Sequence, residues 1–562
     1  MRGRPLVSPG EAAELDREAS ASWGLNPFAL VEAAGRACAA ALAAVCAGPS
    51  YGTPEYQGSS GGCLGFKRIL VCAGPGNNGA DALVLLRALL SDPEGPAPFD
   101  SAVMVSRRTA AGEESPRSEA LAALEKMGVP VFAWGEDGTE ELLDGAGVIA
   151  DVIADVIIDG IAGTGIRGAL EGVPLEMAEA LNRLSGGLSA AGDTAAGYGR
   201  AARRPPPQVV SIDVPSGAGS EWRPGFPLVR AAYTLAIEPL KTVLYTPSIR
   251  PACGRIIPVG GIFPPALINR YGGGAELLGW KEAAAAIPPV SPGDYKYRRG
   301  LAEIHAGASG TAGAARIAAA GASAAGAGLV RLVVDDAMYP VLASSAGGVM
   351  TVPSPPDGEA RDRGRFEPDA MLLGPGWGRE GREGVMRRAL EAEQGGTALV
   401  LDADALALLR KADGSVPAFH GGAILTPHAG EMEALTGIGR ERLLAEPELV
   451  AEWARRLNAV ILFKSHVMIA AGPRGGPVFI DGMDPALGAG GSGDLLAGLC
   501  AGIAARTRGL EKRGGPAFDP LAVAAAAGAL LLAASRRAGR RFYDPLELAG
   551  HAAALAGEAW LP

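Results

Sequence analysis

Short apolar runs, each stopped by glycine, proline or aspartate, recur along the chain and alternate with helical patterns. The apolar runs cover residues 67–73, 102–106, 155–158, 208–212, 301–305, 329–334, 370–373, 398–401, 423–425 and 460–463. A strand followed by a helix and another strand favours parallel pairing, because the helix returns the chain along one face of the sheet. The alternation therefore predicts an α/β fold with mostly parallel, doubly wound sheets.

A chain of 562 residues is too long for one hydrophobic core. Residues 283–292, rich in alanine and proline, interrupt the alternation, which restarts at Leu301. We therefore expect two domains, at residues 1–280 and 281–562. Residues 185–207, rich in glycine, serine and alanine, are expected to form an unstructured surface insertion.

Composition excludes several classes of protein. The formal charge is −10 and there is no dense basic run, which argues against nucleic acid as a partner. The six cysteines form no Cys-x-x-Cys pair, so we expect neither structural zinc nor disulfides. The N-terminus does not resemble a signal peptide, and the apolar run at 521–535 is short of the ~20 residues of a membrane span. We expect a soluble cytoplasmic protein that does not bind membranes.

A glycine-rich stretch at residues 488–494 leads without a break into an apolar helical pattern. Such a loop lets backbone N–H groups approach an anion, which the helix N-terminus also favours. A phosphate-binding loop beside the carboxylate of Asp494 indicates chemistry on a phosphoryl group. The alternative is a flexible turn in which Asp494 caps the helix, and the glycines alone do not decide between the two.

Polar residues follow three strands of the first half, at 74–81, 159–168 and 211–217. Ligands bind beyond the carboxyl ends of parallel strands, so all three groups could meet in one place. Residues 163–168 fit G-x-G-x-x-G, but tight turns explain that match equally well. All five histidines lie at position 305 or later, so proton transfer in the first half must use carboxylates, Lys, Tyr, Cys or water.

The order of these motifs resembles the epimerase domain of the NAD(P)H-hydrate repair enzymes over most of residues 5–275. Asn-Asn-Gly-x-Asp begins at Asn77, Asp-x-x-x-Gly-Thr-Gly at Asp159 and Asp-x-Pro-Ser-Gly at Asp213. The resemblance implies a Rossmann-like domain in which Asp213 contacts the substrate and catalyses epimerisation. It implies a potassium ion held by Asn78, Asp159 and Ser216. The other residues implied to bind the hydrate are Asn77, Gly79, Ala80, Asp81, Gly163, Thr164, Gly165, Ile166, Arg167, Gly168 and Ala169.

The residue types suit that chemistry. The ring nitrogen of a hydrated nicotinamide can expel the C6 hydroxyl, and water can then return to either face of the iminium. Nearby carboxylates could protonate the departing hydroxyl and stabilise the cation.

The second half resembles the dehydratase of the same repair system, a ribokinase-like α/β domain, over roughly residues 290–560. Motifs in the family's order begin at Gly307, Gly374, Asp402, Thr426, Phe463 and Gly488. The resemblance implies that Asp494 is the acid/base residue at the hydrate. The other residues implied to line the hydrate site are Gly378, His428, Ala429, Gly430, Glu431, Met432, Glu433 and Ala434. Those implied to bind the nucleotide are Lys464, Ser465, His466, Val467, Met468, Asp484, Pro485, Ala486, Leu487, Gly488, Ala489, Gly490, Gly491, Ser492 and Gly493.

Each of these motifs also has a purely structural interpretation. His428 and Glu431 could cap the helix that follows them. Asp402 and Asp404 could likewise cap the helix after their strand.

The predicted function is a bifunctional repair enzyme that epimerises hydrated NADH and NADPH and dehydrates the S form. The two-domain arrangement resembles the ADP-dependent form, so we expect ADP as co-substrate, Mg²⁺ on its phosphates, and K⁺ in the first half. The alternative is a ribokinase-like small-molecule kinase with a non-catalytic Rossmann-like domain. Ala80 and Ala82, where the family usually has glycine, favour a third interpretation of the first half as a binding module. A homo-oligomer is expected.

Overall fold

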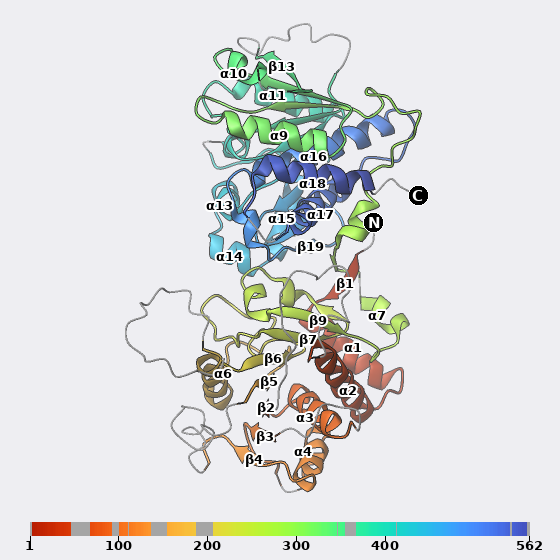
Figure 1. Cartoon of the computed structure of the whole chain (residues 1–562), viewed down its shortest axis with the longest axis vertical. Helices are drawn as coiled ribbons and strands as arrows, with labels where there is room; N and C mark the ends of the chain where they lie inside the picture. The colour runs from red at the N-terminus through yellow and green to blue at the C-terminus, as the bar shows by residue number, and fades with distance from the viewer. Residues whose placement is uncertain are drawn as a thin grey trace, which may run out of the picture. The chain divides into compact units, whose positions relative to one another are not determined.

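The computed structural model describes residues 3–46, 68–92, 100–110, 112–136, 154–186, 206–271, 273–344, 347–354, 367–411, 413–539 and 542–558. The chain forms an N-terminal unit, Pro5–Gly273, and a C-terminal unit, Gly274–Pro562 with Met1–Arg4 (Figure 1). Most of the insertion expected at 185–207 lies outside the described residues. The assignment of one activity to residues 1–280 and the other to 281–562 stays a prediction.

The N-terminal unit alternates strands and helices. Its strands are β1 (Arg4–Val7), β2 (Arg68–Ala73), β3 (Asp100–Val105), β4 (Val131–Ala133), β5 (Val156–Gly160), β6 (Gln208–Ile212), β7 (Tyr233–Ile237), β8 (Leu240–Lys241) and β9 (Arg255–Val259). Its helices are α1 (Pro9–Ala21), α2 (Pro27–Cys46), α3 (Asn77–Leu90), α4 (Pro116–Lys126), α6 (Gly172–Leu184) and α7 (Pro265–Tyr271), with 3₁₀ turns η3 (Thr242–Tyr245) and η4 (Arg250–Cys253).

Seven of these strands form a parallel sheet in the order β4-β3-β2-β5-β6-β7-β9. The strand order reverses between β2 and β5, where Ala73 pairs with Gly160. Ligands of doubly wound sheets bind beyond the carboxyl ends of the strands at such a reversal. This point lies beside residues 74–81 and 159–169.

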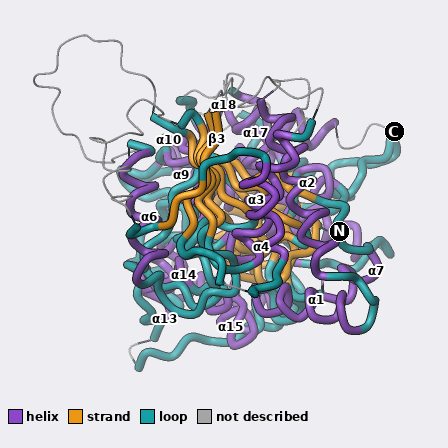
Figure 2. Tube along the Cα trace, turned by 90° about the horizontal axis from the view of Figure 1, so that it is seen from below, coloured by secondary structure: helices purple, strands orange, loops and turns teal. Residues whose placement is uncertain are grey.

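Helices cover both faces of this sheet. α2, α3 and α4 share a core with Ile69 and Val71 of β2, whereas α6 shares a core with Leu70 and Cys72. Alternate residues of β2 thus enter opposite cores, as the two-residue period of a strand requires. Figures 1 and 2 show the strands between α6 on one side and α2 and α3 on the other.

The C-terminal unit restarts the alternation. Its strands are β10 (Ala275–Leu277), β11 (Leu301–His305), β12 (Leu329–Val334), β13 (Met350–Pro353), β14 (Ala370–Leu373), β15 (Ala398–Leu401), β16 (Ala423–Leu425), β17 (Val460–Phe463), β18 (Val467–Ala471) and β19 (Val478–Asp481). Its helices are α8 (Trp280–Ala284), α9 (Ala312–Ala324), α10 (Tyr339–Ala343), α11 (Glu383–Gln394), α12 (Asp404–Ala407), α13 (Ala429–Thr436), α14 (Arg440–Ala445), α15 (Glu448–Leu457), α16 (Ser492–Glu511), α17 (Pro520–Ala538) and α18 (Pro545–Glu558), with the 3₁₀ turn η6 (Pro485–Gly488).

The sheet of this unit runs in the order β13-β12-β11-β14-β15-β16-β17-β18-β19-β10. It is parallel from β13 to β17, and β18 is antiparallel to both β17 and β19. The carboxyl ends of β11, β14, β15, β16 and β17 therefore share one edge. The fold class predicted from the sequence, an α/β chain with a Rossmann-like and a ribokinase-like part, is confirmed.

α16 is the central helix of the C-terminal unit. It shares one core with α9, α17, α18 and the sheet. Small residues allow this close packing, because a Cβ atom on Gly498 would lie only 2.1 Å from the carbonyl oxygen of Ala318 in α9. The packing fixes the start of α16, which directly follows the glycine-rich loop.

Among the described residues, α2 and α17 are long and apolar enough to cross a membrane by length and composition alone. The share of the apolar 18-residue window that is buried inside the protein is 33% in α2 and 67% in α17. Leu42 of α2 and Leu530 of α17 belong to the cores of their own units, as in the packed helices of α/β domains.

Candidate active sites

The first candidate site lies at the carboxyl ends of β2 and β5, where the strand order reverses. The N–H of Gly74 donates to the carbonyl of Gly160 over 3.0 Å and so joins the two strand ends. A Cβ atom on Gly74 would lie 1.7 Å from the carbonyl oxygen of Ile161, so only glycine fits there. The glycine after β2 thus permits the close approach of two loops.

Residues 77–81 form the start of α3 and are not a loop. Gly76 is the helix N-cap, with φ −96° and ψ −170°. The first N–H groups of an α-helix lack intrahelical partners and suit an anionic ligand. Ala80 and Ala82 have no left-handed backbone, and both are buried. Methyl groups therefore fit where the family usually has glycine.

The three residues expected to hold potassium come together here. Buried Asp159 accepts hydrogen bonds from Ser211 Oγ at 2.7 Å, the Ser216 N–H at 2.9 Å and Ser216 Oγ at 2.5 Å. Burial raises the pKa of Asp159, and its hydrogen bonds with Ser216 oppose the shift. A Cβ atom on Gly163 would lie 3.3 Å from Asn78 Cβ. Asn78 is buried, and its Nδ2 has no hydrogen-bond partner among the described residues.

Asp213 directly follows β6 and has a left-handed backbone with φ +63°. Its Oδ1 accepts from Lys241 Nζ at 2.6 Å and from the Ile237 N–H at 3.2 Å. Lys241 is buried and also donates to the Ile237 carbonyl over 2.8 Å. Within the described chain, Oδ2 of Asp213 has no hydrogen-bond partner. The lysine thus fixes the carboxylate by one oxygen and leaves the other open to a substrate. The left-handed backbone of Asp213 is a strained conformation, which is typical of functional sites.

Asp81 is a second carboxyl group close to Asp213. It is buried, and its Oδ1 makes no hydrogen bond to any residue that the structure describes. Burial and the carboxylates of Asp213 and Asp16 raise the pKa of Asp81 well above its usual value, and Lys241 opposes the shift. The site therefore pairs a lysine-held carboxylate with a carboxyl group that favours its protonated form.

The loop after β5 completes this site. The Ala162 N–H donates to Ser216 Oγ over 2.8 Å. A Cβ atom on Gly219 would lie 2.6 Å from the side chain of Ile166, so residues 163–169 contact the loop that follows Asp213. The structure thus brings together the three groups of polar residues that the sequence placed at strand ends.

The second candidate site lies at the carboxyl edge of the C-terminal sheet. Thr311 Oγ1 donates to the Gly376 carbonyl over 2.7 Å and so joins the loops after β11 and β14. The N–H of Gly378 donates to Asp404 Oδ2 over 2.9 Å. Asp404 therefore fixes the loop that contains Gly378, which is expected to line the hydrate site. It does not cap α12, whose N-cap residue Ala403 makes no side-chain cap bond.

A partly buried ionic network lies at the ends of β15, β16 and β17. Lys464 Nζ is 2.6 Å from Asp402 Oδ1 and 3.6 Å from Glu431 Oε2. Thr426 Oγ1 donates to Asp402 Oδ1 over 2.8 Å, so Asp402 has bonding partners other than a helix end. Burial lowers the pKa of Lys464, but the charges of Asp402 and Glu431 outweigh burial and raise it overall. A fixed ammonium of this kind suits nucleotide phosphates.

His428 and Glu431 form a capping box at the start of α13. His428 Nδ1 accepts from the N–H groups of Gly430 at 2.9 Å and Glu431 at 3.2 Å, and Glu431 Oε2 accepts from the His428 N–H at 2.8 Å. The capping interpretation of these two residues is therefore correct. Glu431 also belongs to the candidate site, because the same carboxylate faces Lys464.

Asp494 is the third residue of α16. The N-cap is Gly491, with φ +92° and no side-chain cap bond, so Asp494 does not cap the helix. Its carboxylate makes no hydrogen bond to the described part of the chain. Burial and Asp402 raise the pKa of Asp494 to about 6, Glu431 adds to the shift, and Lys464 opposes it. A half-buried, unpaired carboxylate with this pKa suits proton removal near neutral pH.

The loop before α16 is held at both ends. Asp484 Oδ2 accepts from the Ser535 hydroxyl of α17 over 2.6 Å. Ser492 Oγ donates to the Leu487 carbonyl over 2.8 Å. These bonds fix residues 484–493 in front of the N-terminus of α16, where backbone N–H groups favour phosphate.

In the C-terminal unit, three of the predicted binding residues have buried side chains. Met432, Val467 and Met468 are 0%, 0% and 5% exposed. The side chains of these residues therefore cannot contact a ligand. Contacts through their main chain stay a prediction.

Sequence reasoning missed two candidate functional residues. Lys241 belongs to no motif. The sequence marks it only as a lysine that follows the apolar Leu240, and the structure places both residues in β8. Asp402 begins one of the family's motifs, but the only role expected for its side chain was a possible helix cap. An aspartate directly after a buried strand, beside other strands that end in polar residues, is the signal that could have assigned it to the site.

These units and sites define a two-part α/β enzyme that handles nucleotides. Residues 27–243 match the family model described as YjeF-related protein N-terminus, and residues 302–551 match that of NAD(P)H-hydrate dehydratase. The chain is 30% identical over 565 residues to the bifunctional NAD(P)H-hydrate repair enzyme Nnr of Salinibacter ruber, covering 96% of this chain and 93% of that protein. The chain therefore belongs to the family of bifunctional NAD(P)H-hydrate repair enzymes.

Two further relatives agree with this assignment. The Nnr enzyme of Moorella thermoacetica is 28% identical over 515 residues, covering 89% of this chain and 88% of that protein. The ADP-dependent (S)-NAD(P)H-hydrate dehydratase of Xanthomonas campestris is 33% identical over 234 residues, covering 40% of this chain and 78% of that protein.

Proposed function

We propose that the N-terminal unit interconverts the R and S hydrates of NADH and NADPH. The C-terminal unit then dehydrates the S form at the expense of ADP, giving AMP and phosphate. The observation that carries this proposal is the unpaired carboxylate of Asp494 beside the Lys464–Asp402 pair and the glycine-rich loop. Family membership favours it over a small-molecule kinase, because both units match parts of the repair system.

In the dehydratase, Asp494 removes the proton from the C6 hydroxyl of the hydrate. The resulting oxyanion attacks the terminal phosphoryl group of ADP, which releases AMP and forms a phosphate ester at C6. Lys464 and the first N–H groups of α16 hold the phosphates in place. The ring nitrogen lone pair then expels phosphate, a far better leaving group than hydroxide, and loss of the C5 proton gives NAD(P)H.

In the epimerase, a carboxyl group protonates the departing C6 hydroxyl. Asp81, with its raised pKa, is the donor, and the lysine-held carboxylate of Asp213 stabilises the iminium and guides the returning water. Water adds to either face of the planar ring, so the two epimers interconvert. Lys241 positions Asp213 and takes no direct part in this chemistry.

The residues at the end of β5 fit a potassium ion. Asn78, Asp159 and Ser216 offer amide, carboxylate and hydroxyl oxygens, the hard donors that such a cation prefers, and the Asp159 carboxylate is buried beside the Ser216 hydroxyl. When bound, potassium supplies a fixed positive charge at this strand end.

Magnesium would enter with the nucleotide. Among the described residues, no group of three or more His, Cys, Asp or Glu side chains could hold a metal ion, so nucleotide phosphates would supply most of its ligands. When bound, it neutralises charge on the transferring phosphoryl group.

The test is to add the purified full-length protein to mixed hydrate epimers and follow recovery of dihydronicotinamide absorbance with ADP, ATP or no nucleotide. The expected result is complete recovery with ADP and no dehydration without nucleotide. Recovery that needs no nucleotide would contradict the phosphoryl-transfer step.

A further inference from the structure

Two arginines follow β3, the strand that lies next to β2 in the N-terminal sheet. Ala73 pairs with Val105, and the Ser106 N–H donates to the Ala73 carbonyl over 3.0 Å. Arg107 and Arg108 therefore begin beside the loop that opens α3. In doubly wound dinucleotide-binding domains, residues at the end of this strand contact the adenosine ribose. An acidic residue there binds a free 2′-hydroxyl, and an arginine accommodates a 2′-phosphate.

A third arginine joins this strand end to the loop after β2. Arg117 is 1% exposed, and its Nε donates to the Gly74 carbonyl at 2.9 Å while Nη2 donates to the Arg107 carbonyl at 2.7 Å. Its Nη1 has no partner among the described residues, and neither does the buried hydroxyl of Thr109. The strand end thus holds a rigid guanidinium and two unused donors, which an anion can satisfy.

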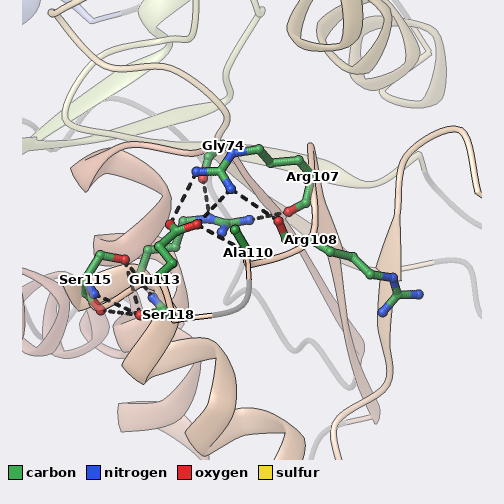
Figure 3. Close-up of polar contacts among 8 residues, drawn as sticks. Gly74, Arg107, Arg108, Ala110, Glu113, Ser115 and Ser118 are labelled. Carbon is green, nitrogen blue, oxygen red and sulfur yellow. Dashed lines mark hydrogen bonds and ion pairs between the residues drawn. The ribbon is translucent and has the colours of Figure 1, made fainter.

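The other two guanidinium groups are accessible. Arg107 Nη1 is 2.8 Å from Glu113 Oε2, and Arg108 Nε is 2.7 Å from Glu136 Oε2. Their side chains are 49% and 54% exposed. Figure 3 shows the Glu113 carboxylate beside the Arg107 guanidinium, whereas the Arg108 side chain extends away from this cluster. Such exposed ion pairs are weak, so a phosphate dianion can compete for the guanidinium forks.

Charge also favours a phosphate at this position. Arg107, Arg108 and Arg117 bring three guanidinium groups to this strand end, and the carboxylates of Glu113 and Glu136 pair with Arg107 and Arg108. Residues 106–110 contain no aspartate or glutamate that would bind a free 2′-hydroxyl and repel a 2′-phosphate.

We propose that Arg107 forms a subsite for the 2′-phosphate of the NADPH hydrate, with Arg108, next to it in the chain, as a second accessible guanidinium, so that the epimerase unit prefers this substrate to the NADH hydrate. Arg117 positions the subsite against the loop that opens α3. The proposal rests on the proposed function of the N-terminal unit and adds its substrate preference.

The test is epimerisation by the full-length protein without ADP, starting from the R hydrate of NADPH or of NADH, with the epimers separated by chromatography. We expect kcat/KM to be at least about tenfold higher for the NADPH hydrate. The double variant Arg107→Ala/Arg108→Ala should lose about 10-fold to 100-fold with this substrate, because charge-assisted hydrogen bonds disappear. Its activity on the NADH hydrate should stay within about twofold. The matched control is Arg36→Ala, another exposed arginine paired with a glutamate.

A second measurement does not depend on the folding of a variant. Adenosine 2′,5′-bisphosphate should inhibit epimerisation by the unaltered protein more strongly than 5′-AMP, which differs only in lacking the 2′-phosphate. Equal inhibition, or equal kcat/KM for the two hydrates, would overturn the subsite while leaving the epimerase assignment intact. Absence of epimerisation with both hydrates would instead overturn the proposed function on which the subsite rests.

Discussion

Asp494 carries the proposed dehydratase chemistry at the scale of a single residue. Asp494→Asn keeps the size of the side chain and removes the base, and no helix cap is lost because Gly491 is the N-cap. We expect turnover to fall by ~10²–10⁴-fold, the usual contribution of a positioned acid/base group, while ADP binding measured by calorimetry is retained. Turnover within a few-fold of the unaltered enzyme would reject Asp494 as the base.

The same variant has a defined effect on stability. The pKa of Asp494 is about 6 in the folded state against an ordinary value of 3.8 for an aspartate, so this residue's contribution to stability is lost as pH rises from about 4 to 6. At pH 8 the ionised carboxylate destabilises the fold, and asparagine removes that penalty. Asp494→Asn should therefore be at least as stable as the unaltered protein at pH 8, which a thermal melt measures.

The charge of Lys464 affects the pKa of Asp494, the proposed base. It lowers the pKa of Asp494, so Lys464→Met should raise that pKa above about 6. A general base acts in its ionised form, and the acid limb of kcat for dehydration should therefore move to higher pH. The control is Lys512→Met, a lysine that is 47% exposed and paired with Asp369. An acid limb that stays in place or moves to lower pH in Lys464→Met would contradict the ionic network as the source of the shift.

At the scale of elements, α16 is held by its close contact with α9. Gly498→Ala would place a Cβ atom 2.1 Å from the Ala318 carbonyl, and we expect it to destabilise the C-terminal unit by about 1–3 kcal/mol, the usual effect of overpacking. The measurement is the thermal transition that added ADP shifts. Gly550→Ala in α18 is the control, because no atom lies within 4 Å of the added Cβ. An unchanged transition in Gly498→Ala would show that α16 has room to move.

Elements with strong local signals were predicted from the sequence. β2 is an apolar run stopped by Gly-Pro-Gly, and α1 has both a proline in its first turn and the Ser8–Glu11 capping box. β8 has only two residues, so its sequence lacks such a signal. β18 and β19 are apolar runs followed by Gly472-Pro473 and by Gly482, so their sequences carry the signal although they were not predicted. The antiparallel pairing of β18 with both neighbours is set by packing and not by the apolar pattern.

The candidate site was only partly predictable, because contacts between distant residues are set by packing. A strand-end motif located Asp213, and the glycine-rich stretch before α16 located Asp494. The pairing of Asp213 with Lys241 depends on β6 and β8 together, and the role of Asp402 depends on Lys464, which lies at the end of another strand. Sequence alone therefore gives neither of these two pairings.

At the scale of the whole molecule, one chain holds both units, so an R hydrate is converted to the S form by the protein that consumes the S form. The family assignment accounts for this pairing of two α/β units with separate sites. The expected homo-oligomer and cytoplasmic location stay predictions.

The most direct measurement of this division of labour follows dihydronicotinamide absorbance in mixed hydrate epimers with ADP. The unaltered full-length protein should restore all of the NAD(P)H. Asp213→Ala should promptly restore only the share present as the S epimer. Asp494→Asn should restore almost nothing in the same time while still equilibrating the epimers. An equal mixture of the two variants should again convert the whole sample. Complete conversion by Asp213→Ala alone in a single phase, faster than spontaneous epimerisation, would contradict the account.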